Sequence, residues 1–180
     1  MTDRYTPPAV VLHWLIALLI FVAFPLGLYM HELPLSPTKL QLYSYHKWIG
    51  ITVLLLVGLR LAWRATHTPP ALPAGMSALQ RKASHAVHGL LYLLMIAVPL
   101  SGWLMSSAKG FQTVWFGVLP LPDLVGKDKA LGEALEEVHE FLNYTMLVLV
   151  VLHVAAAVKH QIQAGGTYLQ RMKLGGKGAR

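Results

Sequence analysis

The sequence predicts an all-α integral membrane protein, folded as a bundle of four transmembrane helices. Four apolar stretches, at about 10–30, 43–62, 85–105 and 139–158, each have roughly the 20 residues that a helix needs to cross the hydrocarbon layer. Hydrophobic residues make up 55% of the chain and charged residues 13%, whereas soluble domains carry about 25% charged residues. We therefore expect one membrane domain over residues 1–180.

The first stretch contains no Asp, Glu, Lys or Arg, although His13 and Pro25 interrupt its apolar character. It is too long for the apolar part of a signal peptide, and no small-residue cleavage site follows it, so we expect a retained helix. The second stretch has His46 and Lys47 near its beginning and Arg60 near its end. Both stretches therefore carry polar residues close to the membrane boundaries.

The third and fourth stretches begin near His85 and His139. The connection between them, about 106–137, is long enough to cover one end of the protein as a lid, although a plain surface loop is the more common outcome. Four spans joined in sequence order pack most simply as a four-helix bundle.

The basic residues are distributed unevenly between the two sides of the membrane. Ten of the fifteen lie on the side of the two termini, and five lie on the other side. The ten are Arg4, Arg60, Arg64, Arg81, Lys82, Lys159, Arg171, Lys173, Lys177 and Arg180, and the five are Lys39, Lys47, Lys109, Lys127 and Lys129. The positive-inside rule then predicts cytoplasmic N- and C-termini. The net charge of +7 is explained by this topology and by contact with lipid, and it does not indicate nucleic-acid binding.

Histidines recur at two depths of the predicted bundle. His139 and His153 lie fourteen residues apart, which is about 21 Å and nearly four helical turns, so both leave one face of the fourth helix. Because alternate helices run in opposite directions, His46 shares the outer level with His139, and His13 shares the inner level with His153. Two imidazole pairs at two levels are the arrangement expected for two stacked haem groups.

The available ligand types narrow the chemistry further. The chain has no cysteine, which excludes c-type haem attachment, cysteine-ligated iron–sulfur clusters and disulfides. Imidazoles on both sides of each haem iron leave no open position for oxygen, and this favours electron transfer over oxygen activation.

Other residues near the inner level are candidates for supporting roles. His85 and His88 lie three residues apart on one face of the third helix, where they could compete as axial ligands or bind a haem propionate or a quinone. His160 lies about 10 Å beyond His153, beside Lys159, and could bind a quinone carbonyl and deliver protons, or be an ordinary interfacial histidine. Arg60, Arg64 and Lys47 are the best-placed cations for propionates, or they anchor the helices at the interface.

Several motifs resemble the bacterial cytochrome b561 family of four-helix, di-haem proteins of the inner membrane. They are LHWL at His13, YHKWIG at His46, HGLLYLLMIAVPLSGW from His88, VHEF at His139 and LHVAAAVKH ending at His160. The resemblance covers nearly the whole chain and implies that His13 pairs with His153, and His46 with His139, as axial ligands of two haem b groups. The fourteen-residue spacing is also similar to that in the cytochrome subunits of membrane formate dehydrogenases and hydrogenases.

The resemblance also implies a reaction and a location. Members of the family exchange electrons with ubiquinone near the inner haem, and one branch oxidises superoxide at the periplasmic face. On this chain, His160 would be the quinone-side residue and Lys47 a candidate at the outer haem, with Lys39 and Lys109 completing a positive funnel if the three side chains converge. We therefore predict an inner-membrane superoxide:ubiquinone oxidoreductase.

Two other classes of function stay open at this stage. The chain could be a cytochrome b anchor subunit that receives electrons from a dehydrogenase partner. It could also be a histidine-lined metal transporter, although the first three spans lack the carboxylates that would escort a divalent ion.

Overall fold

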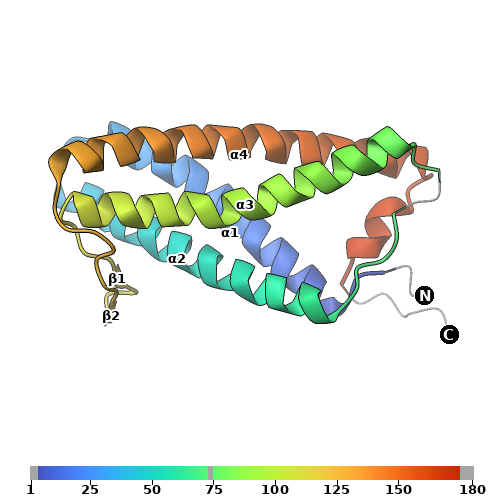
Figure 1. The fold of residues 1–180 in the computed structure, drawn as a ribbon, viewed down its shortest axis with the longest axis horizontal. Coiled ribbons are helices and arrows are strands. Elements are labelled where there is room, and N and C mark those ends of the chain that lie inside the picture. The colour runs from blue at the N-terminus through green and yellow to red at the C-terminus, as the bar shows by residue number, and fades with distance from the viewer. Residues whose placement is uncertain (1–3, 73–74, 175–180) are drawn as a thin grey trace.

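A computed structural model of the chain describes residues 4–72 and 75–174. Four helices make up most of it: α1 (Pro7–Glu32), α2 (Pro37–Thr66), α3 (Ala78–Ala108) and α4 (Lys129–Gln163) (Figure 1). Each is long and apolar enough to cross a membrane, which confirms the predicted four-helix membrane fold. The helices extend past the predicted apolar stretches at both ends. Lys177 and Arg180, which entered the charge count above, lie outside the described residues.

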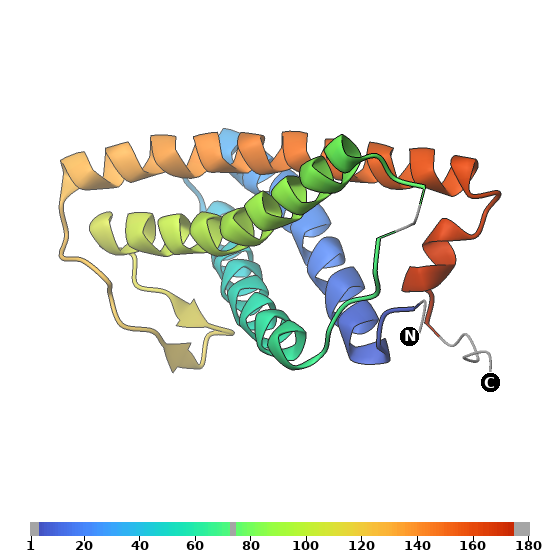
Figure 2. The ribbon, with the colours of Figure 1, turned by 45° about the vertical axis from the view of Figure 1, so that its right-hand side comes forward.

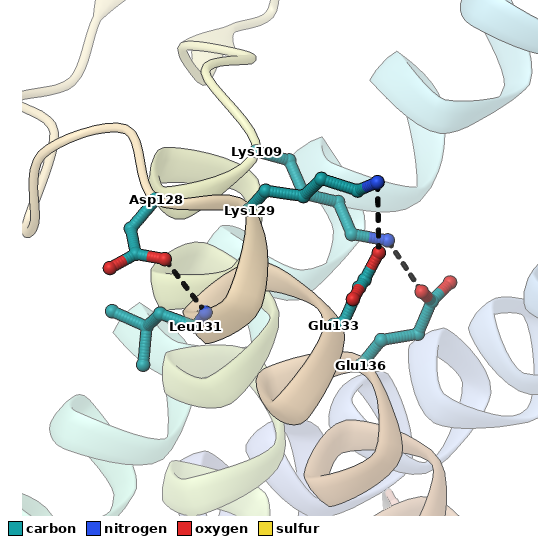
Figure 3. A network of polar contacts seen from close by, with 6 residues as sticks. All are labelled: Lys109, Asp128, Lys129, Leu131, Glu133 and Glu136. Carbon is teal, nitrogen blue, oxygen red and sulfur yellow. Dashed lines mark hydrogen bonds and ion pairs between the residues drawn. The ribbon is translucent and has the colours of Figure 1, made fainter.

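The helix ends follow from local sequence. Proline occupies the first turns of α1 and α2, where its missing N–H costs no helical hydrogen bond. Ser36 caps α2, and Asp128 caps α4 by accepting a hydrogen bond from the backbone N–H of Leu131 at 3.0 Å (Figure 3). Ser77 and Gln80 form a capping box at the start of α3.

Neighbouring helices in sequence pack against one another, as α1 with α2, α2 with α3, and α3 with α4. Side chains of α1 also contact α4. For example, the ring centres of Phe24 and Tyr144 lie 6.1 Å apart. Two buried clusters fill the middle of the bundle. They consist of Ile16, Val53, Val57 and Met95, and of Leu94, Val98 and Met146. Both lie between the two histidine levels, so apolar side chains separate these levels.

The connection between α3 and α4 contains a short hairpin, β1 (Val114–Trp115) paired antiparallel with β2 (Leu119–Pro120). It lies beside α2 near one end of the bundle (Figures 1 and 2). The connection that the sequence predicts as a lid or a plain surface loop thus contains a hairpin that packs on α2.

A 3₁₀ helix, η1 (Tyr168–Met172), folds back beneath the opposite end of the bundle (Figure 2). The indole of Trp14 donates to the carbonyl of Met172 at 2.9 Å, and the backbone N–H of Tyr5 donates to the carbonyl of Arg171 at 3.2 Å. The two ends of the described chain therefore lie at the same end of the bundle, as an even number of spans requires, and they contact each other.

Candidate functional site

The outer histidine pair joins α2 to α4. The ring centres of His46 and His139 lie 6.3 Å apart, and the ring planes are nearly perpendicular at 85°. All four helices contribute to a small cavity of about 50 Å³ beside them, whose wall includes Gly50, Pro99 and Asn143. The structure thus brings together the two residues that the sequence placed at the outer level.

The inner level holds three imidazoles. The ring centres of His13 and His153 lie 6.2 Å apart, with an angle of 70° between the planes. His88, on α3, approaches His153 more closely, at 5.2 Å between ring centres. The predicted partners therefore meet, and His88 adds a third imidazole beside them.

The ring separations can be compared with those that bis-histidine ligation requires. A metal–imidazole bond is about 2.0–2.1 Å long, and the ring centre lies about 1.1 Å beyond the bonding nitrogen, so two axial imidazoles have centres about 6.3 Å apart. The outer pair at 6.3 Å and the His13–His153 pair at 6.2 Å both match this value. The His88–His153 separation of 5.2 Å is about 1 Å too short. The geometry thus favours His13 over His88 as the partner of His153.

Hydrogen bonds orient the His139 imidazole. Its Nδ1 lies 3.0 Å from the carbonyl oxygen of Val98 and 2.9 Å from the hydroxyl of Ser101. Because the carbonyl can only accept, Nδ1 carries the ring proton, which leaves the lone pair of Nε2 available for a metal. This is the usual orientation of a metal-binding histidine.

The His46 imidazole has fewer partners. Its Nδ1 is buried and makes no hydrogen bond of full geometry among the described residues, although the Ala23 carbonyl is near enough to interact with the ring. A buried nitrogen without a full partner is costly unless another group engages the ring. The Ala23 carbonyl can only accept, so it favours a proton on Nδ1 and leaves the lone pair of Nε2 available for a metal.

Two glycines make room for the outer pair. A Cβ atom on Gly27 of α1 would lie 3.2 Å from Cε1 of His46, and one on Gly102 of α3 would lie 3.0 Å from Cε1 of His139. Each glycine therefore faces one imidazole across a helix contact. From sequence these were two among several helical glycines, and only the tertiary contacts distinguish them.

Arginines gather at the inner level. Arg60 donates from Nη1 to Nδ1 of His13 at 3.0 Å, and its guanidinium lies 5.4 Å from the centre of the Tyr92 ring. Arg64 lies 5.8 Å from the same ring. Because the Arg60 contact engages Nδ1 as an acceptor, a bond from Nε2 to a metal requires this contact to be released. Both arginines then lie beside His13 and Tyr92, where an anionic group could be bound.

The remaining inner candidates lie as follows. Nδ1 of His88 is 2.7 Å from the carbonyl oxygen of Ser84, so its Nε2 is left for another partner. The ring of His160 packs 5.4 Å from that of Tyr168 in η1, a contact that sequence reasoning missed because the segment folds back from outside the spans. His85 and Lys159 are exposed on α3 and α4.

The lysines at the outer end have separate partners. Lys47 donates to the Ser106 hydroxyl at 3.3 Å and to the carbonyl of Gln112 at 3.2 Å. Lys39 donates to the carbonyl of Leu33 at the end of α1, and Lys109 forms an ion pair with Glu136 at 2.6 Å (Figure 3). These contacts do not support the converging funnel considered from sequence. Only Lys47 among the three directly follows a histidine of the outer pair.

The described residues contain no group of three or more His, Cys, Asp or Glu side chains close enough to hold a metal ion by themselves. The histidines instead meet in opposed pairs, each suited to the two axial positions of a planar metal complex. Together with four membrane-spanning helices, these pairs define the class of haem-binding membrane bundles.

Sequence comparisons identify the family. The chain belongs to the prokaryotic cytochrome b561 family, whose sequence model matches residues 4–175. Cytochrome b561 homolog 2 of Escherichia coli K12 is 31% identical over 94% of this chain and 91% of its own length. A probable superoxide oxidase, CybB, of Yersinia pestis is 26% identical over 96% of this chain and 97% of its own length. Family membership confirms the predicted resemblance and makes this a haem b membrane protein of electron transfer.

The Gly102 contact yields a quantitative prediction. Changing Gly102→Ala should displace the His139 ring, because the new methyl group lies 3.0 Å from Cε1 before any relaxation. Overpacking of this kind costs roughly 1–3 kcal/mol, so we expect a roughly fivefold to 150-fold loss of affinity for a haem held between His46 and His139. Haem titration of the purified protein, followed by its visible spectrum, measures this loss.

Gly89→Ala on the same helix is the matched control, because nothing lies within 4 Å of its added Cβ. This variant should bind haem as the unsubstituted protein does, and alanine should slightly stabilise the helix. Equal haem affinity in the two variants would contradict the role given to Gly102.

Proposed function

We propose that this protein is a di-haem cytochrome that passes single electrons across the bacterial inner membrane, from superoxide at the periplasmic face to ubiquinone near the cytoplasmic face. The main support is the spacing of the two histidine pairs, 6.3 Å and 6.2 Å between ring centres, at two levels of one bundle. The remaining residues are assigned to this reaction by their positions around the pairs.

His46 and His139 would hold the outer haem, and His13 and His153 the inner one. Haem b supplies the capacity to take up and release single electrons at a potential that its protein surroundings tune. The apolar clusters around Val53 and Met146 keep water out of the space between the two levels. If a histidine binds the iron on each side, no coordination position would be open to oxygen species, so they could react only at the edge of the porphyrin.

The inner end carries groups suited to anions and protons. Arg60 and Arg64 would bind propionates. The Nδ1–H of His88 already donates to the Ser84 carbonyl, so His88 would add a donor at Nε2 only in its doubly protonated form. This arrangement fits cytoplasmic termini under the positive-inside rule. All four helices contribute to these sites, so we propose a single domain over residues 1–180.

His160 and Tyr168 would serve the quinone, with Lys159 beside them. Burial, and to a lesser degree the neighbouring Tyr5, raises the pKa of the Tyr168 phenol above its usual value. Tyr168 therefore stays protonated at neutral pH and can donate a hydrogen bond to a quinone oxygen or to His160. Ubiquinone takes two electrons and two protons to form ubiquinol, and the protons would come from this side.

Superoxide is the donor supported by the name of the Yersinia pestis relative. Two superoxide anions would each lose one electron and leave as oxygen, which balances one ubiquinone reduced to ubiquinol. Lys47 is the candidate cation at this end, because it directly follows His46 and its ammonium lies at the start of the α3–α4 connection. Its positive charge would stabilise an approaching anion.

The test is ubiquinone reduction by the purified chain supplied with superoxide, compared with a His160→Ala variant. We expect the variant to keep both haems and to reduce ubiquinone at least about tenfold more slowly, because general acid catalysis contributes at least this much. Absorbance of ubiquinone and the haem spectrum are followed together.

His67→Ala is the control, because His67 is an exposed histidine stacked on Trp63 near the same end. It should leave the rate unchanged. If the chain with both haems is inert toward superoxide, or reduces quinone only with a dehydrogenase partner, the proposed donor is wrong. If His160→Ala removes a haem, His160 is an axial ligand and the pairing with His153 is wrong.

A further inference from the structure

The α3–α4 connection contains a surface that is unusually apolar for a loop. Residues 111–122, FQTVWFGVLPLP, include no Asp, Glu, Lys or Arg. Within this stretch Val118 is 83% exposed, Phe116 56% and Leu119 51%. Adjacent apolar side chains with this exposure indicate a surface that contacts something other than water.

Contacts with α2 place this hairpin at membrane depth. The indole of Trp48 donates to the carbonyl of Val114 at 2.6 Å, and the indole of Trp115 lies 3.3 Å from the hydroxyl of Thr52. Thr52 is six residues, about 9 Å, further along α2 than His46. Figures 1 and 2 agree that the hairpin lies beside the helices and not beyond their ends.

The same side of α2 continues into a face that must contact lipid. Trp48 and Thr52 are followed at helical spacing by Leu55 and Leu59, which are half exposed or more. Both leucines lie in the apolar part of a helix long enough to span the membrane, so hydrocarbon covers them. The exposed hairpin surface is therefore continuous with a lipid-facing stripe.

The turn of the hairpin holds a bulky residue in a strained backbone conformation, and contacts with aromatic side chains stabilise it there. Phe116 and Gly117, two of the three residues between the paired Trp115 and Leu119, both have positive φ, at 52° and 71°. Asn or Asp usually takes the first of these positions, because a bulky residue is strained there. Contacts of the Phe116 ring with Trp48 and Trp115, at 5.4 Å and 5.0 Å between centres, hold it in place.

We propose that the β1–β2 hairpin is an interfacial membrane anchor, inserted into the leaflet at the His46 end of the bundle. Phe116, Val118 and Leu119 lie among the upper acyl chains, and Trp48 and Trp115 lie at the headgroup level, which tryptophan prefers. Two of the backbone N–H groups of the turn are satisfied within it, because Gly117 donates to the carbonyl of Val114 and Val118 donates to the carbonyl of Trp115. An inserted backbone must be satisfied in this way.

The anchor also has a consequence for the outer site. Lys47 donates to the carbonyls of Phe111 and Gln112, which lie three and two residues before the hairpin. Insertion of the hairpin therefore restrains the chain segment that holds the Lys47 ammonium. The exposed hairpin and its contacts with a membrane-spanning helix indicate the anchor whichever donor and acceptor the protein uses.

A depth measurement tests the proposal, and the absence of native cysteines allows single labels. Val118→Cys is labelled with an environment-sensitive fluorophore in the full-length protein in liposomes. Quenching is compared for lipids with a nitroxide at acyl carbon 5 and for aqueous iodide. Lys129→Cys, whose native side chain is 91% exposed at the start of α4, is the aqueous control, and Leu59→Cys is the membrane control.

We expect the Val118 label to be quenched by the shallow nitroxide lipid and to be at least severalfold less accessible to iodide than the Lys129 label. Iodide access equal to that at Lys129 would place the hairpin in water and overturn the proposal. Protection from both quenchers would mean that protein covers the surface, either a second copy or a partner, and would overturn it as well. Lipid quenching at Leu59 verifies insertion of the protein in every sample.

Discussion

Replacing His139 with alanine is expected to remove one haem and to leave the other, so that the haem-to-protein ratio falls by half. His46→Ala should give the same result, because the two rings lie 6.3 Å apart and would serve as the two axial ligands of one iron. Each substitution would remove a proposed axial ligand and leave a cavity the size of an imidazole. The pyridine haemochrome assay measures the ratio, and the remaining haem should keep its own potential.

His31→Ala is the control for these two variants. His31 is an exposed histidine in the last turn of α1, at the same end of the bundle, and it should not change the haem content. Retention of the full haem content by either His46→Ala or His139→Ala would refute the outer pairing. Loss of both haems would show instead that the two sites form only together.

His153→Ala should remove the inner haem, whereas His88→Ala should keep both. The contrast follows from ring separations at one level of the bundle. His13 lies at 6.2 Å from His153, which fits two axial bonds, and His88 lies at 5.2 Å, which is about 1 Å too short. Low-temperature optical spectra and electron paramagnetic resonance distinguish the two haems and detect any change in their ligands.

Loss of a haem in His88→Ala, together with its retention in His13→Ala, would reverse this assignment. A smaller change in His88→Ala, such as a shifted midpoint potential with both haems present, agrees with a hydrogen bond from His88 to a propionate. His13→Ala therefore completes the set, and it should lose the inner haem as His153→Ala does.

The depth of each residue could be predicted from sequence because depth follows from helix rise. An apolar stretch of known length has to span the hydrocarbon layer, and fourteen residues of helix always advance about 21 Å. His139 and His153 were therefore assigned to two levels without a structure. Because chain direction alternates, His46 and His13 followed, and the structure brings both predicted pairs together.

Lateral arrangement was not predictable in the same way, because it depends on how each helix is rotated and which neighbour it meets. Sequence placed His88 at the inner level but not at 5.2 Å from His153, and it did not single out Gly27 and Gly102 as the glycines that face imidazoles. The partners of Lys39 and Lys109 likewise depend on where loops and helix ends come to lie.

The sequence by itself determined the membrane fold, the family and the levels of the histidines, because these depend on hydrophobic length and on spacing along a regular helix. Only the tertiary structure decided which third histidine is too close to be a partner, and that the loop after α3 turns back along Trp48 and Thr52 of α2. The physical reason is that contacts between segments distant in the chain are set by packing, which no local pattern encodes.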